Sequence, residues 1–294
     1  MREILITQQD AGKKLENFLK KQFPIGYVRK VFRKNGARLN GRRAKPEDSV
    51  NAGDRLQLFI PFDESIKRTT ANAPKKRSLS VIFEDGDILV IDKPPGVAVH
   101  EARGIARHET VIGITEAQYR AKAVRPQLVH RIDQDTSGIL LLAKNAQLAI
   151  DLENAFETGS IEKTYTALLT GRLHQSDGTI EFALPGREGQ AVRALTRFRV
   201  IQRFRETTLV EARIETGRMH QIRLHFAKLG YPVVMDERHG DFGFNKMFRK
   251  DYGLKRQFLH AAKLSMEYRG KKRSWSAALP NDLAEVLKQL SAEL

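Results

Sequence analysis

Two short segments near the N-terminus place apolar residues at the spacing of amphipathic helices. The apolar positions recur every three or four residues: Leu15, Phe18 and Leu19 in the first segment, Val28, Val31 and Phe32 in the second. The pair Phe23-Pro24 ends the first segment, and the turn residues Asn35-Gly36 end the second. Short strands are predicted for 37–40 and 55–60, the latter with alternating apolar positions.

From residue 78 onward the pattern changes to short apolar runs that are typical of strands. Strands are predicted for 81–83, 88–91, 139–144, 164–169, 192–200 and 209–214, and amphipathic helices for 146–156, 219–229 and 282–290. Gly230 is expected to terminate the second of these helices. Strands outnumber helices without a regular βαβ rhythm, which predicts an α+β fold with a mixed, mainly antiparallel sheet flanked by helices.

The pattern divides the chain of 294 residues into three parts. Residues 1–61 are expected to form a small domain, and residues 78–294 a larger one. Residues 62–77 are rich in Thr, Ala, Asn, Lys and Pro, show no apolar periodicity and are expected to be a basic linker.

Charge narrows the range of partners. The chain carries 51 Lys+Arg against 35 Asp+Glu, a net charge of +16, and residues 1–61 alone hold 14 basic against 6 acidic residues. Such an excess favours a polyanion, and RNA is preferred over anionic lipid because no amphipathic segment with an aromatic-rich face accompanies it. The absence of cysteine excludes disulfides, thiolate metal sites and a cysteine nucleophile. No apolar run approaches the ~18 residues of a membrane span, so a cytoplasmic protein is expected.

The basic residues of the first domain cluster on the second helical segment and the turn that follows. They are Arg29, Lys30, Arg33, Lys34, Arg42 and Arg43. The arrangement of two helices, a small hairpin and a Gly53-Asp54 pair before the last strand resembles an S4 RNA-binding domain. The resemblance implies that these side chains contact RNA; the alternative is a solvated, charged surface.

A polar turn that leads into a buried strand carries the main candidate for chemistry. Residues 130–138 read His-Arg-Ile-Asp-Gln-Asp-Thr-Ser-Gly, and an apolar run follows directly. An Asp before a strand is by itself more often a turn or capping residue than a catalyst. This segment, however, resembles the central motif of the RluA family of RNA pseudouridine synthases almost residue for residue.

Four further blocks resemble this family in the same order: residues 87–100, 162–167, 215–225 and 257–261. Together they cover nearly all of the larger domain. The departures are Ile132 and Ile139, where leucine is usual, and residues 235–241, which replace a common "GDxxYG" form and look like the RluC-like branch. That branch implies bacterial large-subunit (23S) ribosomal RNA as the substrate.

The resemblance assigns roles to five side chains. It implies that Asp133 acts at C1′ of a flipped uridine, as nucleophile or base, and that Arg223 pairs with it. Tyr165 would stack on the displaced base, Arg131 would fill the hole that the base leaves, and Leu259 would line the pocket. Each also has a plainer interpretation: a turn residue for Asp133, a surface arginine for Arg223, a core position for Tyr165 and Leu259, and a phosphate contact or structural ion pair for Arg131. Isomerisation imports no group and oxidises nothing, so no cofactor and no metal are expected, and the histidines lack ligand spacing.

Three alternatives remain open. A pseudouridine synthase could act on transfer RNA or another RNA. A glycosylase could also use Asp133 at C1′ but would release free base. A non-catalytic assembly factor for ribosomal RNA would need none of Asp133, Tyr165 and Arg223. A monomer is the default expectation, and Ser137 has no His or Asp at a spacing that would make it a nucleophile.

Overall fold

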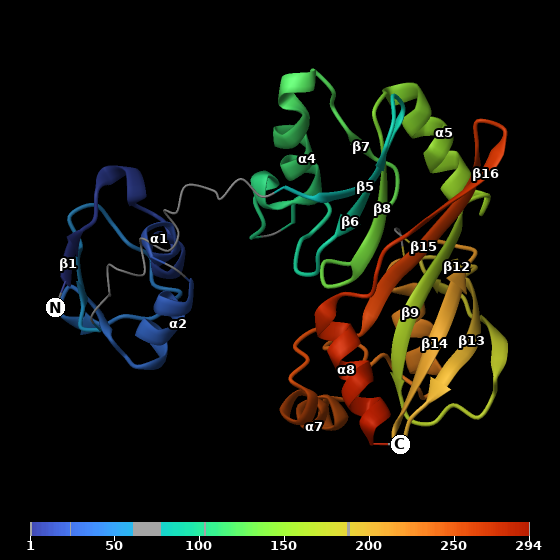
Figure 1. Ribbon diagram of the computed structural model, residues 1–294. Helices are drawn as coiled ribbons and strands as arrows, with labels where there is room; N and C mark the ends of the chain where they lie inside the picture. The colour runs from blue at the N-terminus through green and yellow to red at the C-terminus, as the bar shows by residue number, and fades with distance from the viewer. Residues whose placement is uncertain (1, 24, 61–77, 103, 187–188, 294) are drawn as a thin grey trace. The chain divides into compact units, whose positions relative to one another are not determined.

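The computed structural model describes the chain except residues 1, 24, 61–77, 103, 187–188 and 294 (Figure 1). Its internal contacts divide the chain into two units, residues 1–76 and 77–294, and each is described by itself. The predicted linker 62–77 lies outside the described residues. No helix in the described part of the chain has the length and apolar character that crossing a membrane requires.

The N-terminal unit packs two helices on a four-stranded sheet. Its elements are β1 (Arg2–Leu5), α1 (Leu15–Gln22), α2 (Ile25–Arg33), β2 (Ala37–Leu39), β3 (Arg42–Arg43) and β4 (Arg55–Leu58), with sheet order β1-β4-β2-β3. The predicted helical stripe is the core, since Leu15, Leu19, Val28 and Val31 are fully buried. Strand β1, which pairs with β4, is too short to give a sequence pattern and was not predicted.

A ten-stranded sheet forms the centre of the second unit. Its main path runs β10-β13-β14-β9-β15-β8-β6-β5, while β16 pairs with β15 and β7 with β8. The strands are β5 (Ser80–Glu84), β6 (Ile88–Lys93), β7 (Gln127–Leu128), β8 (Ser137–Ala143), β9 (Glu162–Thr170), β10 (Asp177–Glu181), β13 (Leu195–Arg203), β14 (Thr207–Ile214), β15 (Leu259–Tyr268) and β16 (Lys271–Ser276). Among the pairings between described strands of this sheet, only β8–β15 is parallel, which confirms the predicted mixed, mainly antiparallel class.

Helices pack on both faces of the sheet, and for that reason β8 is apolar without alternation. Leu140 and Leu142 join the cluster that includes α4 (Val111–Tyr119) and α6 (Gln221–Lys228), whereas Ile139 and Leu141 join the cluster with α5 (Ala146–Glu157). The helices α7 (Phe242–Tyr252) and α8 (Asn281–Ala292) form a third cluster with Phe204 and Phe258. Figure 1 shows α7 and α8 together at the lower end of the unit.

Several boundaries differ from the sequence prediction. The predicted strand 192–200 is two elements, β12 (Ala191–Val192), which pairs with β11 (Leu184–Pro185), and the longer β13. Helix α6 begins at Gln221 and not at Met219, because His220 adopts a left-handed conformation with φ 54°. Gly230, with φ 82°, follows the helix end as predicted. Helices α4 and α7 and strands β10, β15 and β16 were not predicted.

Gly138 lets β8 approach β15 directly beside the polar turn. Its φ is 110°, and a Cβ at this position would lie 2.2 Å from the carbonyl oxygen of Ala261. Only glycine combines this backbone conformation with so close an approach of a neighbouring strand. Gly138 therefore fixes where the turn 133–136 meets the sheet.

Candidate active site

Asp133 lies in the turn that precedes β8, at one wall of a cleft of about 540 Å³. The backbone N–H of Thr136 donates to the Asp133 carbonyl at 3.1 Å and closes the turn. The carboxylate keeps 21% of its side-chain surface exposed. Arg131, His220 and Arg223 also line the cleft. The turn thus presents a partly exposed acid to a space that a small planar ligand could enter.

Arg223, in the first turn of α6, holds this carboxylate. Its Nη1 donates to Asp133 Oδ2 at 2.8 Å, although the two residues are 90 positions apart. The arginine side chain is only 6% exposed. Burial works against its charge, but the hydrogen bonds to Asp236 and Asp133 outweigh burial and raise the pKa of Arg223. The predicted pairing of Asp133 with Arg223 is therefore present as a contact.

A second carboxylate, which the sequence analysis did not identify as a site residue, anchors Arg223 from behind. Asp236 accepts from Arg223 Nε and Nη2, each at 2.7 Å, in a bidentate pair. Its Oδ1 also accepts the backbone N–H groups of Arg238 and His239 at 2.9 and 3.0 Å. Burial opposes ionisation, but these partners prevail and lower the pKa of Asp236. Arg223 is thus fixed in orientation, with one remaining donor aimed at Asp133.

Three polar side chains hold the turn itself. Lys93, at the end of β6, donates to the carbonyl of Gln134 at 2.8 Å. Arg256 donates to the carbonyl of Asp135 at 3.1 Å while it forms a bidentate pair with Asp282 of α8. Gln257 donates to Thr136 Oγ1 at 2.8 Å and lies 3.5 Å from Asp133 Oδ2.

Lys93 also ties down the loop that follows β6. Besides Gln134 its Nζ donates to the carbonyls of Pro94 and Val97, at 2.9 and 2.8 Å, and the N–H of Gly96 donates to the carbonyl of Gln134 at 2.9 Å. Three carbonyls match the three N–H bonds of an ammonium group. The side chain is fully buried, and burial, the largest cause, lowers the pKa of Lys93 to about 7.

This buried lysine makes stability depend on pH. The folded protein releases the Lys93 proton above about pH 7, whereas the unfolded chain keeps it until its ordinary pKa of 10.5. The unfolded state binds more protons in this window, so stability should rise with pH, by up to about 1.4 kcal/mol per pH unit. We expect the stability difference between wild type and Lys93→Met, measured by chemical denaturation, to shift in favour of wild type from pH 7 to pH 10. A flat difference would show that the ammonium stays charged.

Tyr165 and Leu259 lie in the apolar cluster that also contains Ile132, next to the turn. Tyr165 of β9 is 7% exposed and Leu259 of β15 is 4% exposed, and neither is among the residues that line the cleft. Burial, together with the negative charge of Asp133, raises the pKa of Tyr165 well above its ordinary value. The site thus brings Asp133, Arg223 and Arg131 to one cleft, and places Tyr165 close enough to Asp133 to feel its charge.

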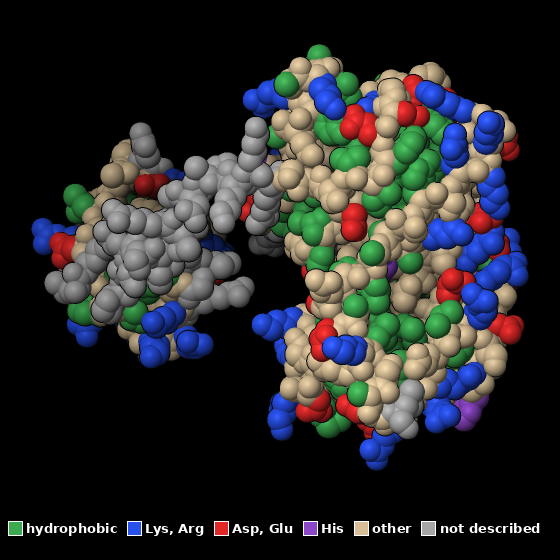
Figure 2. All heavy atoms as spheres, in the orientation of Figure 1, with side chains coloured by type: hydrophobic (Ala, Val, Ile, Leu, Met, Phe, Trp, Pro, Cys, Tyr) green, Lys and Arg blue, Asp and Glu red, His purple; other side chains and the backbone are tan. Residues whose placement is uncertain are grey.

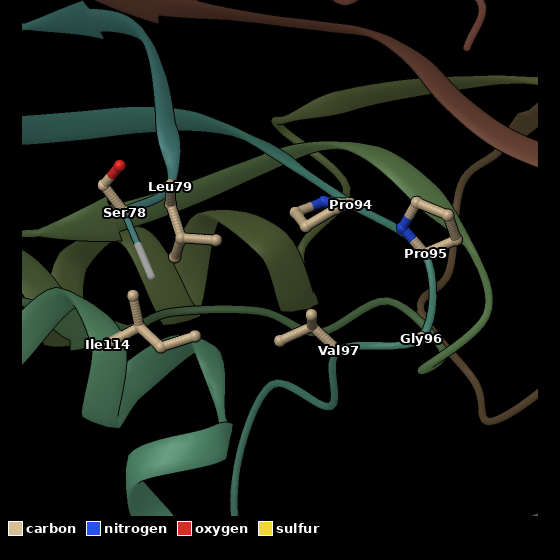
Figure 3. Close-up of a pocket in the computed structure, with 7 residues that line it drawn as sticks. All are labelled: Ser78, Leu79, Pro94, Pro95, Gly96, Val97 and Ile114. Atoms are coloured by element: carbon tan, nitrogen blue, oxygen red, sulfur yellow. The ribbon is translucent and has the colours of Figure 1, made fainter. Parts of the chain in front are cut away.

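A second hollow, of about 440 Å³, lies beside the loop 94–97 (Figure 3). Leu79, Val97 and Ile114 point into it in the close-up, and Pro94 and Pro95 turn the chain away from β6. No ionisable side chain lines it within the described residues. It therefore offers no group for acid–base or nucleophilic chemistry.

Ser137 does have a histidine partner, contrary to the sequence prediction. Its Oγ lies 3.0 Å from Nδ1 of His260, a residue 123 positions later on β15. Both side chains are buried, at 1% and 0% exposure, and His260 Nε2 lies 3.2 Å from the carbonyl of Ala277. The pair connects β8 to β15 and to the segment before α8. Both side chains are buried and neither lines the cleft, so the pair is a structural contact and not a nucleophile–base pair open to a substrate.

The basic residues of the N-terminal unit lie at its surface. Lys30, Arg33, Lys34, Arg42 and Arg43 are exposed, and the side chain of Arg29 lies outside the described part of the chain. Arg43 donates to Asn35, while Lys30, Arg33, Lys34 and Arg42 form no ion pair with any described acid. Within the described residues no group of three or more His, Asp or Glu is placed to hold a metal ion.

The contact between Asp133 and the buried Arg223, at the entry to a central strand, agrees with what the family resemblance implies. The family model for RNA pseudouridylate synthase matches residues 87–228. A protein of Vibrio cholerae named ribosomal large subunit pseudouridine synthase C is 35% identical over 88% of this chain and 86% of its own length. A Bacillus subtilis protein named uncharacterized RNA pseudouridine synthase YlyB is 30% identical over 98% of this chain and 97% of its own.

The fold agrees with these sequence relationships. The solved structure of human RNA pseudouridylate synthase domain containing 4 superposes with a TM-score of 0.62 at 22% identity, covering 72% of this chain and 93% of that one. The chain belongs to the RluA-type family of RNA pseudouridine synthases. It is therefore an isomerase that converts uridine in RNA to pseudouridine.

Proposed function

We propose that this protein modifies particular uridines of bacterial large-subunit ribosomal RNA, acting as a cytoplasmic monomer, with Asp133 as the catalytic carboxylate. The observation that carries the proposal is the Asp133–Arg223 pair at the wall of the cleft, 2.8 Å apart. The name of the Vibrio cholerae relative supports the choice of RNA. The proposal is tested by nucleoside analysis of treated RNA, which should yield pseudouridine and no free uracil.

The reaction requires an anion at C1′ of the target uridine. The N1–C1′ bond breaks, the base turns and C5 joins C1′. While the base is detached, either a nucleophile must bond to C1′ or a base must remove a proton from the neighbouring carbon of the sugar. A carboxylate can do either, as a nucleophile or as a base, by the same logic that places carboxylates in glycosidases. Arg223 donates a charge-assisted hydrogen bond to Asp133 and so holds the carboxylate in place. Because Asp236 holds the other side of Arg223, this donor cannot swing away from Asp133.

Tyr165 and Arg131 act on the base and on its former position. Tyr165 can stack against the displaced ring, and its hydroxyl can take part in proton transfer during the isomerisation. Leu259, in the same cluster, supports the ring from the apolar side. Arg131, exposed at the cleft, is placed to enter the RNA stack in place of the flipped uridine, whose extrusion costs a few kcal/mol.

The N-terminal unit supplies affinity for folded RNA as an S4-type module. Its support is the exposed cluster of basic side chains at the end of α2 and on β3, which form no ion pair with a described acid. Further basic residues flank the catalytic unit: Figure 2 shows Lys and Arg side chains along the edge where Figure 1 places β16. Charge of this kind neutralises phosphates and makes binding depend on salt.

Neutralising the N-terminal cluster should therefore weaken RNA binding and flatten its salt dependence. We expect replacement of Lys30, Arg33, Lys34 and Arg42 by glutamine to lower the slope of log affinity against log salt by roughly 0.7–0.9 for each phosphate that is no longer neutralised. Filter binding at several salt concentrations measures both quantities. Lys20→Gln on α1, where Lys20 pairs with Glu16, is the matched control. An unchanged slope in the fourfold variant would show that this surface does not touch RNA.

A further inference from the structure

Gln257 lies beside Asp133 and approaches the same oxygen of its carboxylate as Arg223 does. Nε2 of Gln257 lies 3.5 Å from Asp133 Oδ2, and Arg223 Nη1 donates to that oxygen at 2.8 Å. The other oxygen, Oδ1, accepts no hydrogen bond from the part of the chain that the structure describes, and His220 Nε2 approaches it only to 3.9 Å. Asp133 therefore has one oxygen that two side chains hold and one that is left without a donor.

The surroundings of Gln257 fix its side chain. The residue is buried, although it lines the cleft, and its Nε2 also donates to Thr136 Oγ1 at 2.8 Å. The backbone of the next residue, Phe258, is bonded on both sides: its N–H donates to the carbonyl of Val234 at 2.9 Å, and its carbonyl accepts from the N–H of Leu168 at 3.2 Å. A side chain on so rigid a support can hold a neighbouring group in one position.

The chemistry of the two groups determines which way the amide of Gln257 turns. An ionised carboxylate only accepts hydrogen bonds, and the nitrogen of a primary amide carries two N–H bonds. One N–H of Gln257 serves Thr136, so the second is available to Asp133 Oδ2. A distance of 3.5 Å is at the outer limit of a hydrogen bond, and contacts of this kind commonly shorten when a substrate fills the site.

A carboxylate that only one donor holds is free to turn. The terminal torsion of an aspartate side chain has a broad, two-fold energy profile, so its two oxygens exchange places readily. Arg223 gives Asp133 one hydrogen bond, because its Nε and Nη2 are taken by Asp236. A second donor to Oδ2, which comes from the segment before β15 and not from α6, opposes this rotation and keeps Oδ1 in one place.

We propose that Gln257 is a positioning residue, which together with Arg223 holds Oδ2 of Asp133 and thereby presents Oδ1 to the sugar of the target uridine. The inference rests on the proposed function, in which Asp133 acts at C1′. It follows from the contacts, because both donors meet at one oxygen and the other oxygen has none. Gln257 forms no bond to the substrate and transfers no proton. It therefore sets the position of the carboxylate and leaves the steps of the isomerisation unchanged.

The first test removes the donor from the full chain. Gln257→Met keeps the length of the side chain but has no N–H, and we expect its single-turnover rate on unmodified large-subunit RNA to fall about 10- to 100-fold. RNA affinity, measured by filter binding, should stay at the wild-type level, because the substitution acts on the carboxylate and not on the RNA. Gln147→Met is the matched control and should keep the wild-type rate. Gln147 of α5 also donates to an aspartate, Asp151, at 3.3 Å, but it is exposed and lies outside the cleft.

A second variant, Gln257→Glu, separates positioning from packing. With a proton, the new carboxyl donates to Asp133 as the amide does; without one, two negative charges face each other. Its rate relative to wild type should therefore fall as pH rises from about 5 to about 9, whereas the ratio for Gln257→Met should be the same throughout. Gln147→Glu, which places a carboxyl beside Asp151, is the control and should follow wild type at every pH. The other charged and titratable groups that face the site are common to all these proteins: Lys93, Tyr165, His220, Arg223, His239 and Arg256.

The outcomes separate this role from a structural one and from the proposed function. A wild-type rate in Gln257→Met, or equal losses in Gln257→Met and Gln257→Glu at every pH, would overturn the positioning role. If Gln257→Met does not fold, the pH dependence of Gln257→Glu decides alone: a falling ratio supports the role and a constant ratio overturns it. Absence of pseudouridine with wild type would instead overturn the proposed function.

Discussion

Replacing Asp133 with asparagine is expected to abolish isomerisation while folding and RNA binding persist. Asparagine has almost the same shape but supplies neither a nucleophile nor a base at C1′, so the rate should fall by about 10⁴-fold or more, as for other residues that form the reactive group of a site. Arg223 keeps Asp236 as its counter-ion, so the melting temperature should change little. Single-turnover assays and filter binding on the same RNA measure the two effects separately.

A matched carboxylate provides the control for this variant. Asp151→Asn removes an exposed acid on α5 that lies outside the cleft and should leave the rate at the wild-type level. RNA affinity of Asp133→Asn should stay within a few-fold of wild type. If Asp133→Asn turned over near the wild-type rate, Asp133 would not be the catalytic carboxylate, even though it contacts Arg223.

Replacing Arg223 with methionine is expected to damage both stability and activity. Asp236 is fully buried, and without Arg223 its charge would be left without a counter-ion, at a cost of about 3–5 kcal/mol for a buried pair broken on one side. Two backbone N–H groups would still serve Asp236, so the protein should fold at low temperature. Arg223→Lys keeps the charge but loses the planar guanidinium that contacts both acids. Its stability should therefore lie between those of wild type and Arg223→Met. Denaturant titration of the three proteins tests this order.

Two further variants show whether the unpaired charge of Asp236 causes the loss of stability in Arg223→Met. Adding Asp236→Asn to Arg223→Met removes the orphaned charge and should recover part of the lost stability. Arg249→Met breaks an exposed pair with Glu237, which is worth about 0–1 kcal/mol. If Arg223→Met were no less stable than Arg249→Met, the buried cluster would not be what holds the site together.

The sequence predicted those features that depend on neighbours along the chain. The unbroken apolar run 139–143 predicted a buried strand, and β8 has helices on either side. The pairing of Asp133 with Arg223, which the family resemblance implied, is present as a 2.8 Å contact. Strands β15 and β16 escaped prediction because charged residues interrupt their apolar positions, as Lys263 does in β15.

What the sequence could not supply is the choice of partners among polar residues far apart in the chain. Lys93 donates a hydrogen bond to the carbonyl of Gln134, 41 positions away in the sequence, and Arg256 donates to the carbonyl of Asp135, 121 positions away. Nothing in the local pattern separates such residues from ordinary surface charges, since their burial is a product of the tertiary fold. The sequence analysis noted that residues 235–241, which include Asp236, depart from the family's usual motif. It did not predict the bidentate pair of Asp236 with Arg223.

The measurement that tests the central claim most directly maps pseudouridines on RNA that lacks modifications. Purified wild type and Asp133→Asn are incubated in parallel with large-subunit ribosomal RNA, small-subunit ribosomal RNA and transfer RNA. Carbodiimide-dependent stops of reverse transcription then locate pseudouridine, and free uracil is assayed in the same samples. We predict stops at a few positions of the large-subunit RNA that are absent with Asp133→Asn, and no uracil. Stops confined to another RNA would contradict the proposed substrate, and released uracil or equal stops with both proteins would contradict the proposed chemistry of Asp133.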